Sequence, residues 1–151
     1  MLNHWSDACT ATEGELSFLN HPSFDLSYVE NGNYVRLQWK GPQTLSTIKT
    51  GCQQLHELLL ASGADKVLND GRDVVGNWTA SIPWIVYCFL PRARTAGVRK
   101  AAHVLARERK SHMSAYAFRL YADFCEWNIE LFRTIGEAED WLIRELYRLS
   151  T

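Results

Sequence analysis

The stretch "FDLSYVENGNYVRLQWK", residues 24–40, decides the fold because it predicts a β-hairpin. Its two halves alternate apolar and polar residues, as strands with one buried face do. From Val35 to Trp39, for example, every second side chain is apolar. The dipeptide Asn31-Gly32 stands between the halves, and Asn-Gly is the strongest short-range signal for a tight hairpin turn. A pair of antiparallel strands is therefore expected near the start of the chain.

The segments beside the hairpin add one strand and one helix. A similar alternation in "ELSFL", residues 15–19, predicts an edge strand before the hairpin. After the hairpin, apolar residues recur on one helical stripe from Leu45 to Leu59. Thr44 is expected to cap this helix, and Ser62-Gly63 is expected to end it.

A long loop is expected after the next strand, "KVLND" at residues 66–70. The loop has the sequence "GRDVVGNWTASIPW", and Thr79 or Ser81 near its end is expected to cap the following helix. Pro91 should kink or stop that helix, because proline lacks the backbone N–H that a helix interior requires.

The rest of the chain continues to alternate strand and helix. Residues 100–106 and 129–133 are expected to be strands, and residues 114–127 an amphipathic helix. Thr134 and Glu137 form a capping box that opens a last helix. This order predicts an α/β fold, in which a mixed sheet has an N-terminal antiparallel hairpin followed by parallel βα units, with helices packed on the sheet.

Length and composition favour one folded domain. The chain has 151 residues, of which 46% are hydrophobic and 22% charged, as in globular proteins. Residues 1–13 are expected to be a flexible arm, and residues 14–151 a single domain. The start of the chain has no leader pattern, and no run approaches the roughly 18 apolar residues of a membrane span. Four scattered cysteines without a CxxC pair indicate reduced thiols, so we expect a cytoplasmic protein.

Several short segments resemble the SpoIIAA-like group of the STAS, or anti-sigma-factor antagonist, superfamily. They are "LQWKGPQTL", "VLNDGRDVVGNW", "AAHVLA" and the ending "IELFRTIGEAEDWL", and the likeness extends over about residues 14–147. They look most like an uncharacterised bacterial subgroup of these domains. The resemblance implies a fold that is used for binding and regulation. Its ligands would be protein partners controlled by phosphorylation, or apolar and lipid-like molecules.

The resemblance departs from the family pattern where the antagonists are phosphorylated. Those proteins present a serine on a short turn that resembles Asp-Ser-Ser-Gly, whereas this chain has the longer segment "NDGRDVVGNWTAS". Only Thr79 and Ser81 are available there as possible phosphorylation sites. Both residues also have a simpler use as helix caps.

The charged and aromatic residues indicate further surfaces. Residues 92–119 hold eight bases and one acid, Glu108, but aromatic residues that stack on bases are not interleaved with them, so a solvated face is favoured over a nucleic-acid site. Tyr116, Tyr121, Phe124 and Trp127 crowd one helix. An aromatic helical face of this kind could line an apolar pocket or form a homodimer.

No catalytic motif is present in the sequence. It lacks GxGxxG, GxxxxGK[ST], GxSxG and HExxH, so no catalytic residue and no cofactor are predicted. Cys52 and His56 are one helical turn apart, but no further ligand is near them, so no metal site is predicted either. The alternative is a small enzyme that uses His103 or Asp70 as a base and arginines to hold an anionic substrate.

The expected position of a binding site is the carboxyl edge of the sheet, where open α/β sheets bind their ligands. The candidate binding residues there are Asp70, Arg72, Asp73, Trp78 and Arg107. A simpler interpretation is that these charges pair with each other and hold the loop in place. The sequence therefore predicts a non-catalytic binding or regulatory module for a protein partner or a small apolar or anionic ligand.

Overall fold

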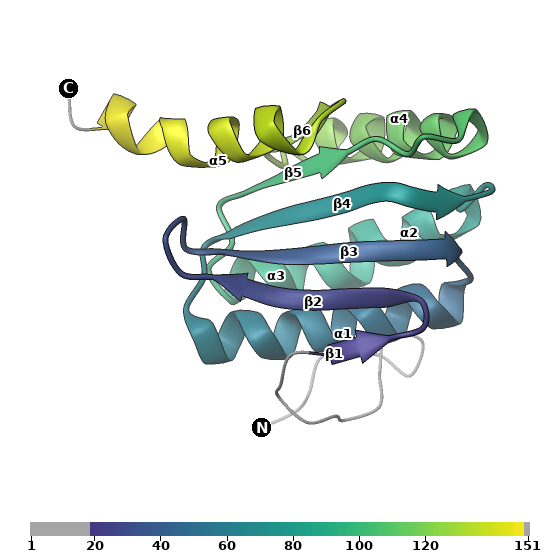
Figure 1. Ribbon diagram of the computed structural model, residues 1–151, viewed down its shortest axis with the longest axis horizontal. Helices are drawn as coiled ribbons and strands as arrows, with labels where there is room; N and C mark the ends of the chain where they lie inside the picture. The colour runs from purple at the N-terminus through teal and green to yellow at the C-terminus, as the bar shows by residue number, and fades with distance from the viewer. Residues whose placement is uncertain (1–18, 150–151) are drawn as a thin grey trace.

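A computed structural model of the chain describes residues 19–149 as one six-stranded sheet with helices on both faces (Figure 1). The strands lie side by side in sequence order. The first three strands form two antiparallel pairs, and the third to the sixth strands form three parallel pairs. Their bounds are β1 Leu19–His21, β2 Phe24–Val29, β3 Tyr34–Pro42, β4 Lys66–Val75, β5 Lys100–Val104 and β6 Ile129–Phe132.

The predicted hairpin is confirmed as β2 and β3. Phe24 lies opposite Trp39 and Leu26 lies opposite Leu37, so these four apolar side chains share one face of the sheet. All four are buried. We call this the first face, and the face that carries Tyr34 the second face.

The helices that follow β3, up to β6, cover the first face and enclose the larger core. Their bounds are α1 Leu45–Ser62, η1 Thr79–Ser81, α2 Ile82–Trp84, η2 Ile85–Phe89, α3 Leu90–Thr95 and α4 Arg109–Phe124. Helix α1 begins and ends where the sequence predicts. Thr44 and Thr47 form a reciprocal capping box, and Gly63 adopts the left-handed conformation that ends a helix.

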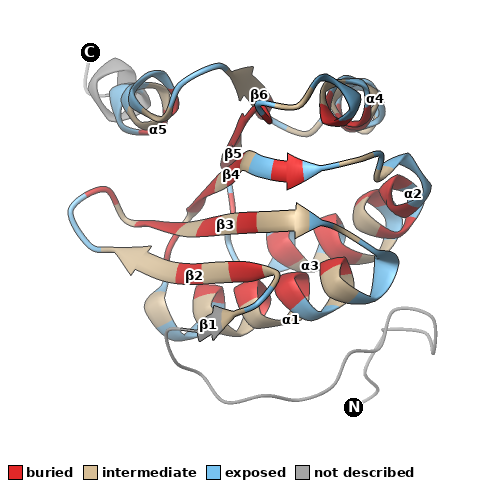
Figure 2. Ribbon diagram, turned by 45° about the vertical axis from the view of Figure 1, so that its right-hand side comes forward, coloured by how far each residue is buried: buried red, intermediate tan, exposed pale blue. Residues whose placement is uncertain are grey.

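Of the described helices, α5 (Ile135–Leu149) alone lies on the second face. Ala138 and Leu142 are fully buried in a smaller core with Leu68 and Val104 of the sheet. Helix α5 packs over β4, β5 and β6, and its Glu139 accepts a hydrogen bond from the Tyr34 hydroxyl at the start of β3, while most of β2 and β3 has no helix on this face (Figure 2). Most side chains that β2 and β3 present on this face are therefore only partly buried.

The prediction of a loop directly after Asp70 is wrong, because β4 continues to Val75. Gln38 pairs with Asp70 but Lys40 pairs with Asp73, so β4 contains one extra residue at this point. Such a bulge interrupts the alternation that identifies a strand in sequence. The remaining connection between β4 and η1 is therefore short.

Pro91 does not stop its helix, since the chain stays helical to Thr95. Residues Ile85–Phe89 form a π-helical turn, in which the Leu90 N–H bonds the Ile85 carbonyl. This shift in the hydrogen-bond pattern lets the helix pass Pro91, which has no N–H to donate. Neither Thr79 nor Ser81 caps the helix through its side chain, contrary to expectation.

The predicted α/β fold class, with its hairpin, parallel βα units and packed helices, is confirmed. The expected arm at residues 1–13 and most of the strand expected at 15–19 lie outside the described residues. Thr134 caps α5, and its hydroxyl also donates a hydrogen bond to the Glu137 carboxylate. No helix between residues 19 and 149 is long and apolar enough to cross a membrane.

Candidate functional site

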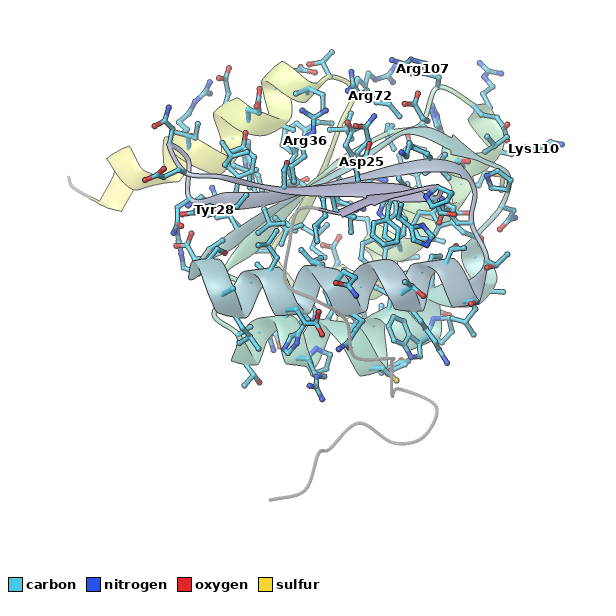
Figure 3. The ribbon with its side chains drawn as sticks, turned by 60° about the horizontal axis from the view of Figure 1, so that its bottom comes forward. Asp25, Tyr28, Arg36, Arg72, Arg107 and Lys110 are labelled. Carbon is cyan, nitrogen blue, oxygen red and sulfur yellow. The ribbon has the colours of Figure 1, made fainter. Side chains whose placement is uncertain are left out.

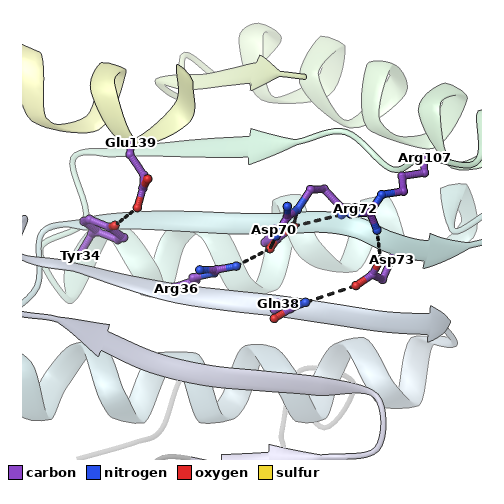
Figure 4. Close-up of polar contacts among 8 residues, drawn as sticks. All are labelled: Tyr34, Arg36, Gln38, Asp70, Arg72, Asp73, Arg107 and Glu139. Atoms are coloured by element: carbon purple, nitrogen blue, oxygen red, sulfur yellow. Dashed lines mark hydrogen bonds and ion pairs between the residues drawn. The ribbon is translucent and has the colours of Figure 1, made fainter. Parts of the chain in front are cut away.

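Four of the five candidate binding residues meet on the second face (Figure 4). Asp70 has a fully buried side chain, and its carboxylate accepts hydrogen bonds from Arg36 at 2.9 Å and from Arg72 at 3.0 Å. The bulge in β4 lets Asp70 bond the backbone N–H and the side chain of Arg72 together.

Asp73 and Arg107 extend this arrangement toward the end of the sheet. Arg107 donates to the Asp73 carboxylate, which also accepts a hydrogen bond from Gln38. Figure 3 shows that Arg36, Arg72 and Arg107 all project from the side of the sheet that α5 occupies. We call these six residues, Arg36, Gln38, Asp70, Arg72, Asp73 and Arg107, the polar cluster.

Hydrogen bonds within the polar cluster set the charge of Asp70. Burial alone would raise the pKa of this carboxyl, but the hydrogen bonds from Arg72 and Arg36 outweigh it and lower the pKa. The pKa of Arg72 is raised in turn by its hydrogen bonds to Asp70. Most of these charges are paired within the polar cluster, which agrees with the simpler of the two interpretations, but the buried Nε of Arg36 has no hydrogen-bond partner among the described residues.

Trp78, the fifth candidate, lies on the other side of the sheet. Its ring is 6.1 Å from the ring of His103 and 6.0 Å from that of Phe118. Its backbone N–H donates to the Ser114 hydroxyl of α4. The candidate residues therefore do not form one site, because the sheet separates Trp78 from the polar cluster.

The two possible phosphorylation sites differ in exposure. Ser81 is buried, whereas Thr79 is exposed. The hydroxyl of Thr79 lies 3.1 Å from that of Ser114, and its N–H bonds Asn77. The connection between β4 and η1 is also held by Glu108, whose carboxylate accepts a hydrogen bond from the Gly76 N–H at 2.7 Å. The segment before η1 is thus fixed to α4 along its length.

Beneath Trp78 lies an interior cavity of about 100 Å³ between the first face and the helices. Its walls are mostly apolar and come from β3, β4, β5, α1, the π turn, α3 and α4. The lining includes Trp39, Asn69, Gly71, Trp78, Ala101 and His103. Small-molecule sites are likewise lined mostly by apolar side chains with a few polar groups, but they are usually larger than this cavity.

A chain of three polar side chains crosses the cavity wall. The Trp39 indole N–H donates to Asn69 Oδ1 at 2.7 Å, which fixes the orientation of the amide. Asn69 Nδ2 therefore faces His103 Nδ1, at 2.6 Å, and donates to it. His103 then carries its proton on Nε2, because a neutral imidazole has one donor and one acceptor nitrogen.

Burial lowers the pKa of His103 to about 4, although the charge of Asp70 works in the opposite direction. The imidazole is thus neutral near pH 7. No group among the described residues bonds its Nε2. Gly71 makes space beside it, since a Cβ there would lie 3.2 Å from Nε2 and 2.9 Å from the Val104 carbonyl oxygen. The cavity therefore offers one N–H donor in apolar surroundings.

Sequence reasoning identified His103 and Trp78 but missed Asn69 and Trp39. A polar residue in the middle of the buried strand "KVLND" was the available signal for Asn69. Nothing local indicates the partner of Asn69, because Trp39 comes from the neighbouring strand and meets it only through strand pairing.

The cysteines and histidines do not gather at either place. Cys52 lies in the core of the first face, where burial raises the pKa of its thiol. Residues 19–149 contain no group of three or more His, Cys, Asp or Glu side chains that could hold a metal. Cys52 and Cys125 are free thiols.

Comparison with protein family models, with curated proteins and with solved structures gave no match for this chain. The two residues considered as an enzymatic base, His103 and Asp70, project from opposite faces of the sheet. His103 faces the cavity, whereas Asp70 is held by arginines. Among the described residues, the lining of the cavity that His103 faces includes no arginine.

Proposed function

We propose that this chain is a non-catalytic binding module of the STAS-like type that takes up a small, mostly apolar, uncharged ligand in the interior cavity. The observation that carries the proposal is the neutral His103, whose Nε2–H faces an apolar space without a partner among the described residues. A ligand with one hydrogen-bond acceptor, such as a carbonyl oxygen, would satisfy it. A regulatory role in a bacterium is the use that the resemblance to anti-sigma-factor antagonists supports.

The size of the cavity limits the ligand. An apolar cavity of about 150 Å³ binds benzene, so a space of about 100 Å³ suits a molecule of about four or five heavy atoms. Burial gains at most about 1.5 kcal/mol per heavy atom for very small ligands. We therefore expect millimolar to micromolar affinity for such probes. A longer natural ligand would have to widen the space between the helices and the sheet.

Two probes of matched shape test this proposal. Cyclobutanone and methylenecyclobutane differ in that the first has a carbonyl oxygen where the second has a methylene group. We expect both to shift the indole N–H NMR signals of Trp39 and Trp78, and cyclobutanone to bind about tenfold more tightly, as one hydrogen bond of about 1.4 kcal/mol implies. In His103→Phe the two affinities should become equal.

Filling the cavity provides the second arm of the test. Ala101→Leu adds a larger apolar side chain to the cavity wall and should abolish binding of both probes. Circular dichroism of this variant should match that of the original chain, which checks that it remains folded. If neither probe moves the two indole signals at millimolar concentration, the cavity is closed packing space and the proposal is wrong.

A further inference from the structure

The outward side of α4 carries large apolar side chains that no other described part of the chain covers. They follow helical spacing and lie opposite the face through which Phe118 and Ala122 enter the core. Leu120 is 71% exposed and Phe124 is 90% exposed. We call Met113, Tyr116, Leu120, Tyr121 and Phe124 the α4 outer stripe. A contiguous apolar surface of this kind is typical of an interaction site.

The charges at the two ends of α4 have opposite signs and are placed unfavourably for a single helix. Arg109 and Lys110 stand in its first turn, while Asp123 and Glu126 stand at its end, and all four are exposed. The helix dipole favours acids at the beginning and bases at the end, which is the reverse order. Within residues 19–149, Arg109, Lys110 and Glu126 make no ion pair, and Asp123 reaches Arg119 only at 3.7 Å. The monomer therefore gives no electrostatic reason for this arrangement.

We propose that two copies of this chain associate through α4, with the two helices antiparallel about a twofold axis. In that arrangement the α4 outer stripe of one copy packs on the same stripe of the other. The bases at the start of each helix then lie beside the acids at the end of its partner. A lipid surface is a poorer match, because an anionic membrane that attracts Lys110 would repel Asp123 and Glu126 on the same helix. A second copy complements the apolar residues and both sets of charges together.

The expected dimer is weak. A single helix face is smaller than the roughly 800 Å² that each partner contributes to a standard interface, so we expect a dissociation constant in the micromolar range. Sedimentation velocity of the full chain, over concentrations from about 1 μM to about 500 μM, should show a shift from a 17.3 kDa monomer to twice that mass.

Substitution on the stripe tests the apolar part of the interface. Leu120→Glu should leave the chain monomeric at every concentration, because it buries a charge twice in the symmetric contact. Tyr87→Glu is the matched control, since Tyr87 is a similarly exposed apolar residue, 65% accessible, on the π turn. It should dimerise like the original chain. Both positions point to solvent, so circular dichroism of each variant should be unchanged.

A charge exchange tests the antiparallel orientation. Lys110→Glu and Glu126→Lys should each raise the dissociation constant by about tenfold or more, because each places like charges together at two symmetric contacts. The double variant restores opposite charges and should return to within about threefold of the original value. Recovery in the double variant is the result that a nonspecific apolar association would not give.

Three results would overturn the proposal. The chain could sediment as a monomer throughout the concentration range, or Leu120→Glu and Tyr87→Glu could weaken the dimer equally. The chain could also remain monomeric and bind vesicles of phosphatidylserine and phosphatidylcholine through Leu120, which would assign the stripe to a lipid surface. None of these results bears on the cavity, whose test uses separate variants and probes.

Discussion

His103 determines how the stability of this protein depends on pH. An unfolded histidine has a pKa of about 6.5, whereas burial lowers that of His103 to about 4. Between these values the unfolded chain binds a proton that the folded chain does not. The contribution of His103 to the free energy of unfolding is therefore greatest above pH 6.5, and it is lost as the pH falls toward 4.

This effect gives a direct measurement. We expect the free energy of unfolding in urea to fall by about 3 kcal/mol between pH 7 and pH 4 because of His103. In His103→Phe, which has no proton to bind, this part of the decline should be absent. The same slope in both proteins would show that His103 is accessible to solvent in the folded state.

Two arginines of the polar cluster, which the sequence analysis treated alike as candidate binding residues, should contribute differently to stability. Arg72 bonds the fully buried Asp70, and Arg72→Gln should cost about 1–3 kcal/mol by removing charge-assisted hydrogen bonds, with Arg36 still in place. Arg107 is mostly exposed and pairs with an exposed Asp73, so Arg107→Gln should cost less than about 1 kcal/mol. Equal losses in chemical denaturation would mean that Asp70 does not depend on Arg72.

At the scale of elements, replacing two helical glycines with alanine should change the free energy of unfolding in opposite directions. A Cβ at Gly51 of α1 would lie 2.4 Å from the Trp39 ring, so Gly51→Ala should cost about 1–3 kcal/mol through overpacking, despite its better helix propensity. A Cβ at Gly136 of α5 meets nothing within 4 Å, and Gly136→Ala should stabilise by up to about 1 kcal/mol. Thermal unfolding of both variants tests whether α1 lies as close to the sheet as described.

Regular elements were predicted well and irregular ones were not. The hairpin, α1 and the later strands each follow one periodicity, with turn or capping residues at their ends, so local sequence contains the information. The second half of β4 and the π turn each contain one residue more than a regular element. An extra residue breaks the period, and what compensates for it is packing against distant segments.

The candidate site was predicted in part for a related reason. Asp70, Arg72 and Asp73 were identified because they stand near the end of one strand in sequence, and Arg107 because it follows the next strand, whereas Arg36 and Gln38 were missed. The sequence did not predict on which face of the sheet each side chain lies, because the bulge after Asp70 changes the alternation for every later residue of β4. Trp78 was therefore grouped with Asp73, although the two lie on opposite sides of the sheet.

For the whole molecule, α5 closes the second core and should contribute much of its stability. Leu142 is fully buried against the sheet, so Leu142→Ala should lower the free energy of unfolding by about 2–5 kcal/mol. Its neighbour Ile143 is 38% exposed, and Ile143→Ala should lower the free energy of unfolding by less, about 1 kcal/mol. A small effect at Leu142 would mean that α5 is peripheral to the folded unit.

The bulge in β4 and the π turn of η2 have a consequence for how such a protein can change during evolution. Both are single-residue insertions into regular elements, and both border the interior cavity through Gly71 and through Ile85 and Phe89. Loss of one codon at either place would restore a regular strand or helix and would also rotate the wall of the cavity. Natural variants with such deletions should therefore keep the architecture while differing in what they enclose.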